Sequence, residues 1–463
     1  MVYTLLNHIQ GKKGSRWAKF LQTAGLENIL IVAVDAAKYT HKAMICTFYG
    51  EILKKPFEFD ASLTGHNQLI SQIEKVSQET GKQSIVIGIE TTGHYYEDLV
   101  RHWQGNSYYV RIINAATTSE ERKALLNRSK TDNLDLLAIT QSVINGRGTS
   151  SELPSGSVHE LQKLTRARRT IVQEKTALQN EIRVHIDHIF REFQGMSIWR
   201  DGKRVHVQPF EKLFGKAGRY LMRHFIHPSD IINLGVDGLR EISIKENLKI
   251  RDSSIQLLLE FASNSISRPK EELEIDHFLL VHKLDRLELV NQQIDEMEQK
   301  IASLFIETEG AVLLTVPGVG LVTGAELYGE MGDISDFDHA GQLIKMAGTN
   351  PIVVQSGGRN PTYHCISREG RRTFRNSVYQ IGKSLAMHNP KMKKQYQEMR
   401  DRGKYARQAY IALGNRMIRL AFAMIRKQTM YQSEEADYTL LAELTKKLKA
   451  QHVKRFYTRY FAV

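Results

Sequence analysis

The stretch ILIVAVD, at Ile29–Asp35, is an unbroken apolar run that ends in an acidic residue. A run of aliphatic and β-branched residues without polar alternation is typical of a β-strand covered on both faces. We therefore expect an α/β domain to begin here, with Asp35 at the end of its first strand.

The segments that follow alternate between strand-like and helix-like composition. Strand-like segments are HKAMICTFYG (41–50), EILKKPFEF (51–59), QSIVIGIETTG (83–93) and YYVRIINA (108–115). Helix-compatible segments are GHNQLISQIEKVSQET (65–80), YYEDLVRHWQ (95–104) and TDNLDLLAITQSVING (131–146). Three strands, helix, strand, helix, strand, helix is the order of the ribonuclease H fold, so we expect such a domain over 29–150. In that fold the first and fourth strands are neighbours.

Acidic residues fall where these predicted elements begin or end. Asp35 and Glu90 end two strands, and Asp132 and Asp135 share one face of the last helix at i and i+3. Converging carboxylates raise one another's pKa, so they favour bound cations. Oxygen ligands suit Mg²⁺ or Mn²⁺, and a pair of such ions assists phosphoryl transfer. Taken singly, each acid has an alternative role in a turn, and Asp132 could cap the helix beginning near Asn133.

Length and composition limit the class of protein. With 463 residues, 41% of them hydrophobic and 25% charged, the chain is expected to form two or three globular domains. It has no apolar run of the ~20 residues that a membrane span requires, and its first residues do not follow the order of a signal peptide. Two cysteines are too few for a disulfide framework, which favours a cytoplasmic location.

The net charge of +13 is unevenly distributed. Residues 368–427 contain sixteen Lys or Arg against three Asp or Glu, a bias that favours a polyanionic partner over an ordinary solvated surface. We therefore expect this segment to bind nucleic acid.

The middle of the chain, 156–308, has the periodicity of long helices. The apolar residues Leu280, Leu287, Val290 and Ile294 follow a heptad pattern, and a similar pattern starts at Leu164. Two such helices are expected to pair as a coiled coil, within one subunit or between subunits, although a plain helical bundle would give the same pattern. Residues of about 195–270 are polar and basic and are interpreted as an inserted subdomain with short helices.

The C-terminal domain, 309–430, begins with a glycine hairpin between two predicted helices. In VPGVG (316–320), Gly318 and Gly320 would let backbone N–H groups approach DNA phosphates, as in helix-hairpin-helix motifs. The same glycines also suit an ordinary turn.

Ser356 follows a short strand-like run and precedes Gly357, Gly358 and Arg359. Small neighbours would let a phosphate reach the hydroxyl, although a serine before two glycines is commonly a turn residue. The arginines able to neutralise such a phosphate are Arg359, Arg368, Arg371, Arg372 and Arg375.

Taken together, these motifs resemble the DEDD recombinases of bacterial insertion sequences, the "one-ten" group, which are akin to pilin-gene invertases. The resemblance lies in VAVDAAK, GIETTGHYYEDL and KTDNLDLLAI, and in VPGVGLVTGAEL, MAGTNPIVVQSGG and ISREGRRTFR. It covers roughly 29–150 and 310–430. Thr349 departs from the family's usual aliphatic residue, and the extension 1–28 and the region 195–270 exceed its compact members.

The resemblance implies a transposase that cuts and rejoins DNA. Ser356 would form a covalent link to phosphate, and Asp35, Glu90, Asp132 and Asp135 would hold Mg²⁺ or Mn²⁺. It further implies double-stranded donor and target DNA, a structured bridge RNA as guide, and subunits that assemble through dimers into a tetramer.

Two other hypotheses remain open from the residues themselves. A metal-dependent Holliday-junction-type endonuclease would hydrolyse DNA with water and use Ser356 only structurally. A non-enzymatic nucleic-acid scaffold would make the acids incidental. The basic tail, 431–463, is compatible with nucleic-acid contact, with subunit contact or with packing on its own domain.

Overall fold

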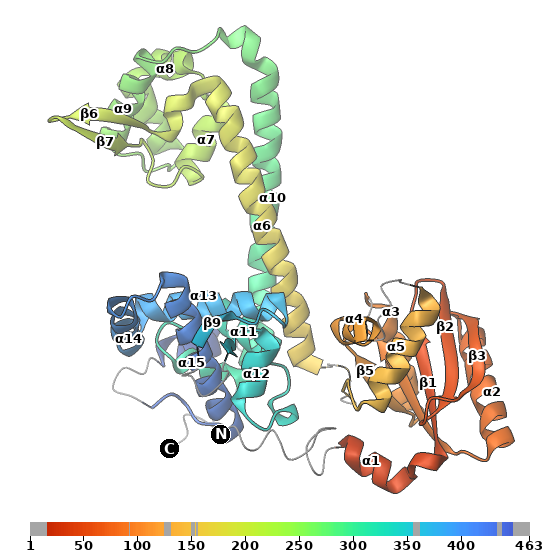
Figure 1. The fold of residues 1–463 in the computed structure, drawn as a ribbon. Coiled ribbons are helices and arrows are strands. Elements are labelled where there is room, and N and C mark those ends of the chain that lie inside the picture. Colours follow the sequence, from red (N-terminus) through yellow and green to blue (C-terminus); the bar gives the residue numbers. More distant parts are fainter. Residues whose placement is uncertain are drawn as a thin grey trace. The chain divides into compact units, whose positions relative to one another are not determined.

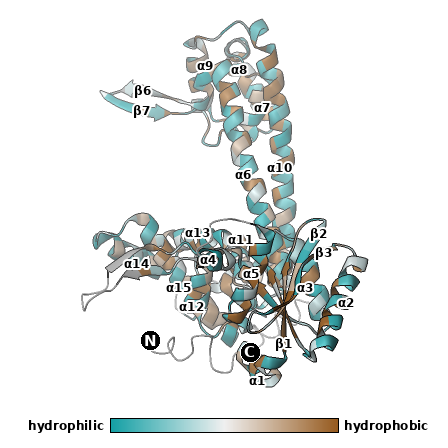
Figure 2. Cartoon of the chain, turned by 45° about the vertical axis from the view of Figure 1, so that its right-hand side comes forward, coloured by the Kyte–Doolittle hydropathy of each residue, from teal (hydrophilic) through white to brown (hydrophobic). Residues whose placement is uncertain are grey.

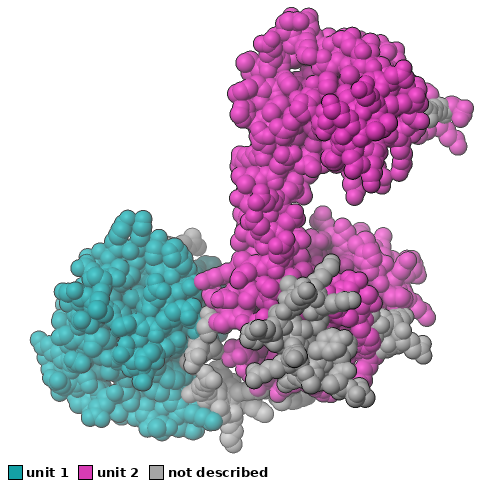
Figure 3. Space-filling view, turned by 180° about the vertical axis from the view of Figure 1, so that it is seen from behind, with its two compact units in different colours: residues 1–154 teal, residues 155–463 magenta. Residues whose placement is uncertain are grey.

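The computed structural model describes residues 16–91, 93–124, 131–149, 153, 156–354, 362–432 and 438–447. The chain divides into two compact units, residues 1–154 and 155–463 (Figures 1 and 3). Each unit has hydrophobic cores of its own. The segments expected to be separate middle and C-terminal domains therefore belong to one unit.

Unit 1 is a mixed α/β domain with a central sheet. Its elements are α1 (Arg16–Ala24), a 3-10 turn (Leu26–Asn28), β1 (Ile29–Asp35), β2 (Thr40–Thr47), β3 (Ile52–Asp60), α2 (Leu63–Thr80), β4 (Ser84–Glu90), α3 (Tyr95–Gly105), β5 (Tyr109–Ile113), α4 (Ala115–Ala124) and α5 (Asp132–Ile144). The strand order is β3-β2-β1-β4-β5. β1 is antiparallel to β2 and parallel to β4, so the predicted pairing of the first and fourth strands is confirmed.

Side chains of β1 alternate between two cores on opposite faces of the sheet. Leu30, Val32 and Val34 pack in the core that contains α2 and α3. Ile29, Ile31 and Ala33 pack in the core that contains α1 and α5. Because helices cover both faces, the whole run from Ile29 to Val34 is fully buried, which explains its unbroken apolar sequence (Figure 2).

Two helices of unit 1 differ from the expected organisation. α1 lies in the segment expected to be an extension, yet Trp17 is buried in the sheet's core, so the described part of that extension belongs to the domain. α4 lies between β5 and α5, where no helix was predicted. Its sequence, AATTSEERKA, is too polar to give a clear apolar stripe.

Unit 2 begins with a long helix and is mostly helical. Its elements are α6 (Gly156–Phe190), a 3-10 turn (Arg191–Gln194), β6 (Met196–Arg200), β7 (Lys203–Val207), α7 (Lys216–His224), α8 (Pro228–Lys245), α9 (Asp252–Ser263), a 3-10 turn (Lys270–Leu273), α10 (Glu274–Ile306), a 3-10 helix (Glu309–Thr315), α11 (Leu321–Met331), a 3-10 turn (Ile334–Asp336), α12 (Ala340–Ala347), β8 (Pro351–Val354), β9 (Thr362–Ile366), α13 (Arg372–His388), α14 (Pro390–Asp401), α15 (Ala406–Lys427) and α16 (Thr439–Lys447).

The helices α6 and α10 pack against each other along their length (Figure 1). Ion pairs join Glu181 to Lys283 and Glu174 to Arg286, each at 2.6 Å. Residue numbers rise along one helix as they fall along the other, so the pair is antiparallel. The prediction that two long helices pair is confirmed within a single chain, while coiled-coil geometry stays a prediction.

The segment between these helices packs against the C-terminal end of α6 and the N-terminal end of α10. Ile182 and Ile186 of α6 and Leu284 of α10 share a core with side chains of α7, α8 and α9. The predicted inserted subdomain thus depends on the helix pair for its core. Its hairpin β6–β7 was not predicted, although Asp201-Gly202 is a characteristic two-residue hairpin turn.

The helices α11 to α15 surround the core of the C-terminal part of unit 2. Within the described ranges, no helix is both long enough and apolar enough to cross a membrane. Cys46 and Cys365 are both free thiols.

Candidate functional site: a carboxylate edge and a serine-bearing hairpin

The register of unit 1 brings two of the predicted acids to one edge of the sheet. Val34 of β1 pairs with Ile89 of the parallel strand β4, and each strand ends at the next residue. Asp35 and Glu90 therefore leave the same edge of adjacent strands, and both are half-buried. This is the arrangement that the sequence predicts for these two residues.

The other two acids begin helix α5. The side chain of Thr131, not Asp132, caps this helix by accepting a hydrogen bond from the Leu134 N–H at 3.4 Å. Asp132 and Asp135 lie in the first turn, where the helix dipole stabilises negative charge. Asp132 is exposed and Asp135 is buried.

Close packing between α5 and the sheet fixes the position of these acids. A Cβ atom added at Gly88 of β4 would lie 2.6 Å from a methyl group of Val143 in α5. Any side chain at Gly88 would push the helix away from the strand. The glycine in IVIGIE therefore lets α5 lie directly on β4, which is the strand that carries Glu90.

Polar side chains of the same unit contact the carboxylates of Glu90, Asp132 and Asp135. Lys42, opposite Asp35 in the β1–β2 register, donates a hydrogen bond to Asp132 at 2.7 Å. That hydrogen bond is the main cause of the raised pKa of Lys42. Arg122 of α4 forms an ion pair with Asp135, and the buried Thr118 donates a hydrogen bond to Glu90. None of these three partners is predicted from the sequence.

The donor set fits a hard divalent cation in chemistry, although the acids do not converge tightly. Asp35, Glu90, Asp132 and Asp135 supply carboxylate oxygens, the ligands that Mg²⁺ and Mn²⁺ prefer. No three of them offer oxygens within 4.8 Å of one another. Lys42 and Arg122 instead neutralise two of the acids, so both cationic side chains would have to release them before all four could hold an ion.

Three other potential metal ligands lie closer together than these acids do. Within the part of the chain that the structure describes, His185 and His188 of α6 and Asp276 of α10 offer ligand atoms within 4.8 Å of one another. Asp276 also forms an ion pair with Arg268 at 3.6 Å. We interpret these contacts as fixing α6 against α10.

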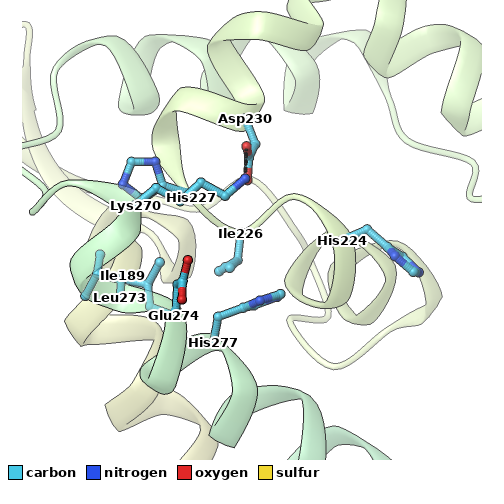
Figure 4. A pocket seen from close by; sticks show the side chains of 9 residues that line it. All are labelled: Ile189, His224, Ile226, His227, Asp230, Lys270, Leu273, Glu274 and His277. Atoms are coloured by element: carbon cyan, nitrogen blue, oxygen red, sulfur yellow. Dashed lines mark hydrogen bonds and ion pairs between the residues drawn. The ribbon is translucent and has the colours of Figure 1, made fainter.

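A small cavity lies beside that junction (Figure 4). Its volume of about 80 Å³ suits a few water molecules rather than a nucleotide. His227 contacts Ser229 at 2.7 Å, and Lys270 pairs with Asp230. Because these polar groups have partners within the chain, we interpret the cavity as part of the subdomain's packing.

Ser356 and Arg359 lie in the segment 355–361, outside the described residues. The strands on either side, β8 and β9, are antiparallel, and Val354 pairs with Thr362. The predicted nucleophile therefore belongs to the connection of a two-stranded hairpin.

The root of this hairpin is tightly packed. A Cβ atom added at Gly370 would lie 2.4 Å from the Met346 carbonyl oxygen. The guanidinium of Arg375 donates hydrogen bonds to the carbonyls of Ala347 and Arg368 at 3.3 and 3.1 Å. Arg375 thus holds together the two chain segments that lead into and out of the hairpin.

The remaining predicted arginines surround the start of α13. Arg372 is the first residue of that helix and is exposed, as is Arg368, whose φ of 58° lies in the left-handed region. Arg371 donates a long hydrogen bond of 3.5 Å to the Glu330 carbonyl. Their proximity gives this end of α13 a concentrated positive charge.

The VPGVG segment forms a turn between the 3-10 helix and α11. Gly318 has a φ of 89°, and its carbonyl accepts a hydrogen bond from Ser384 at 2.7 Å. Gly320 is exposed, and its N–H donates to the Thr323 hydroxyl at 3.1 Å. The glycine at 318 is thus required by the turn itself, while phosphate binding by this segment stays a prediction.

A buried network that the sequence reasoning missed joins α6 to α11. Arg166 makes a bidentate pair with Glu330 at 2.7 and 2.9 Å. Arg169 binds Glu326 at 2.8 Å and the Ser377 hydroxyl at 3.2 Å. The spacing of the two arginines at i, i+3 and of the two glutamates at i, i+4 shows that each pair shares one face of its helix. That spacing does not reveal that α6 packs against α11.

Two transposase family models match the chain. A model of DEDD type for the IS110 group, described as Transposase, covers residues 32–191. A second, described as Transposase IS116/IS110/IS902 family, covers residues 310–397. The matched segments include the carboxylate edge in the first unit and the serine-bearing hairpin in the second.

Proteins from several bacteria are similar to this chain in the same way. The chain is 21% identical to a protein of insertion element IS116 from Streptomyces clavuligerus over 403 residues, which is 86% of this chain and 95% of that relative. It is 27% identical to the transposase for IS1328 from Yersinia enterocolitica over 180 residues, 35% and 52% of the two chains. It is 25% identical to the pilin gene-inverting protein of Moraxella bovis over 149 residues, 31% and 46% of the two chains.

A unit with a carboxylate-lined sheet edge, followed by a helical unit with a basic C-terminal part, suits an enzyme that acts on nucleic acid, and both family models that match the chain are those of transposases. The chain belongs to the IS110/IS116/IS902 family of transposases. It is a transposase or recombinase whose substrate is DNA.

Proposed function

We propose that this transposase cuts and rejoins DNA through a covalent link between Ser356 and a DNA phosphate, assisted by divalent metal at the carboxylate edge. The observation that carries the proposal is the convergence of Asp35 and Glu90 at one edge of parallel strands. The assignment of Ser356 as nucleophile rests on the resemblance of its SGG segment to the segment that carries the family's catalytic serine.

In the proposed reaction, the Ser356 hydroxyl attacks a phosphodiester. The hydroxyl loses its proton as the Oγ–P bond forms, the bond from phosphorus to the leaving deoxyribose oxygen breaks, and that oxygen takes up a proton, so no net proton is consumed. The energy of the broken bond is kept in the phosphoserine link, so rejoining needs no ATP. Arg359 and Arg372 are suited to neutralise the phosphate.

Asp35, Glu90, Asp132 and Asp135 would hold Mg²⁺ or Mn²⁺. Such an ion supplies Lewis-acid polarisation of the phosphate oxygens. Thr118 orients Glu90, and Arg122 keeps the buried Asp135 neutralised until it is needed. The strand order β3-β2-β1-β4-β5 supports assigning unit 1 to the ribonuclease-H-like class.

The partners follow from the family resemblance and the charge distribution. We propose that a structured bridge RNA guides the enzyme to donor and target DNA, so that base pairing supplies sequence specificity. Subunits assemble through dimers into a tetramer that acts in the cytoplasm. Because the serine and the acids lie in different units, subunits sharing one active site is part of this proposal.

The test is a search for a protein–DNA adduct. Purified protein with its co-purifying RNA and Mg²⁺ is incubated with end-labelled junction DNA, denatured and separated by electrophoresis. We expect a labelled adduct that disappears in Ser356→Ala. The matched control is Ser335→Ala, which removes an exposed serine hydroxyl from the same unit and should leave the adduct unchanged.

A metal-dependent Holliday-junction-type endonuclease is the second candidate. It is favoured by the placement of all four acids within unit 1, which would let that unit act with water as nucleophile. This reading predicts cleavage without an adduct and no effect of Ser356→Ala. That pair of results would replace the proposed serine chemistry.

A further inference from the structure

The β6–β7 hairpin of the inserted subdomain is a two-stranded ribbon exposed on both faces. The strands pair from Met196–Val207 at the root to Arg200–Lys203 at the tip. Among large hydrophobic side chains of the ribbon, Trp199 is 74% exposed and Val205 is 41% exposed. A two-stranded hairpin has little stability of its own in water, so an exposed ribbon of this kind needs a reason.

Both ends of the ribbon are held in defined conformations. At the tip, Asp201 and Gly202 have φ values of 49° and 70°, the pattern of a type I′ turn. At the root, a Cβ atom added at Gly195 would lie 2.7 Å from the Val207 carbonyl oxygen. Phe193 and Phe210, just outside the strands, are buried and in ring contact at 5.2 Å. The ribbon is therefore a fixed projection of the subdomain (Figure 1).

The two faces of the ribbon differ in chemistry. Trp199 pairs with Arg204 and Ser197 with His206, and paired residues of an antiparallel ribbon share one face. All four are exposed. The opposite face carries the pairs Met196–Val207 and Ile198–Val205, which make it the more apolar one, and the cationic pair Arg200–Lys203 beside the turn. An exposed tryptophan between cationic and polar side chains is suited to a flat, anionic partner.

The charges favour nucleic acid. Residues 196–207 contain Arg200, Lys203 and Arg204 against the single acid Asp201, in addition to His206. The enzyme already acts on DNA, so the polyanion present at its surface during the reaction is nucleic acid.

We propose that the β6–β7 ribbon, with Trp199 and Arg204 on its contact face, inserts into the major groove of duplex DNA. Strands of this length extend about 17 Å, and a paired ribbon fits the ~12 Å width of the B-form major groove. The deep, narrow major groove of duplex RNA does not admit it. The inference rests on the proposed function only in taking DNA as the substrate.

Intrinsic fluorescence tests this directly, because the three tryptophans differ in exposure. Trp17 and Trp103 are 3% and 0% exposed, so contact with DNA reports on Trp199. The full-length protein is titrated with duplex DNA in EDTA, where chemistry does not interfere. We expect strong quenching in the wild type and none in Trp199→Phe, which retains the ring's bulk.

Affinity variants supply the second readout. Trp199→Ala should weaken duplex DNA binding about tenfold, and Arg204→Ala should reduce the slope of log K against log salt by about one. Lys245→Ala is the matched control, since it removes another exposed cation from the same subdomain. Circular dichroism and melting curves establish that the variants are folded.

The outcomes separate this inference from the proposed function. Three results would each overturn the ribbon assignment. They are fluorescence that duplex DNA does not quench, unchanged DNA affinity in both ribbon variants, and a titration that gives higher affinity for duplex RNA than for duplex DNA. An adduct at Ser356 would survive any of these results. Quenching without an adduct would retain the ribbon and reject the serine chemistry.

Discussion

Two sets of carboxylates in this transposase have cationic partners, and their settings differ. At the edge of unit 1, Lys42 contacts Asp132 with side chains 29% and 60% exposed, so this ion pair lies in water. In unit 2, the Glu330 side chain is 2% exposed and accepts hydrogen bonds from Nε and Nη2 of Arg166. The first set lies at the ends of strands and a helix, whereas the second lies between packed helices.

This difference separates a site from a structural connection. An ion pair in water contributes little stability, so its carboxylate is readily transferred to a metal ion. A buried, bidentate pair cannot open without leaving a charge in the interior. Asp135 is an exception at the edge, since its pair with Arg122 has side chains only 10% and 16% exposed. We therefore expect Asp35, Glu90 and Asp132 to govern activity and the buried glutamates to govern stability.

The largest expected effect is on activity at the edge. Asp35→Asn or Glu90→Gln removes a ligand charge and should lower recombination by about a thousandfold, corresponding to about 4 kcal/mol of transition-state stabilisation. Junction DNA formation is measured by quantitative PCR, and thermal unfolding is measured on the same samples. If the variants instead lose about as much unfolding free energy as transition-state stabilisation, these acids have a structural role and not a catalytic one.

The buried network should show the opposite pattern. Arg166→Ala leaves Glu330 buried without its cation and should cost about 3 kcal/mol of unfolding free energy, or a midpoint lowered by about 5 °C. Glu330→Gln should cost less, because the remaining Arg166 is 40% exposed and can reach water. Calorimetry of both variants checks this asymmetry, and equal losses would contradict it.

A smaller effect concerns the competition between Arg122 and metal for Asp135. Removing the cation in Arg122→Ala should tighten Mn²⁺ binding by roughly tenfold, since Asp135 then has no internal partner from that residue. Electron paramagnetic resonance of free Mn²⁺ gives the affinity. Lys75→Ala, which breaks an exposed pair with Glu79, is the control and should have no effect.

The smallest effect is a pH dependence of unit 1 that is independent of the edge. Burial, with the neighbouring His102, lowers the pKa of His66 from 6.5 to about 4. Below pH 6.5 the unfolded chain therefore binds more protons than the folded one, so stability falls as pH falls from 6.5 to 4. His66→Phe should flatten this decline in thermal melts, and an unchanged pH profile would contradict the assignment.

The sequence was most informative where one local rule sufficed. The apolar run at Ile29–Val34 predicts a strand buried on both faces, and the strand order predicts that Asp35 and Glu90 meet. It could not supply Arg122, because α4 is polar and its position depends on tertiary contacts, mainly with α5. The Arg166–Glu330 pair spans 164 residues and depends on how α6 meets α11, which no local pattern encodes.

The ribbon illustrates the same limit in another way. Its Asp201-Gly202 turn is visible in the sequence, and the apolar Met196, Ile198, Val205 and Val207 alternate with Ser197, Arg204 and His206. Each strand has only five residues, however, which is too short for this alternation to identify a strand.

The most direct measurement is calorimetric Mn²⁺ binding to the full-length wild type, to Asp35→Asn and to Glu330→Gln. We expect Asp35→Asn to lose the Mn²⁺ binding seen in the wild type and Glu330→Gln to retain it. Equal binding by all three proteins, or loss only in Glu330→Gln, would contradict the assignment of the metal site to the carboxylate edge.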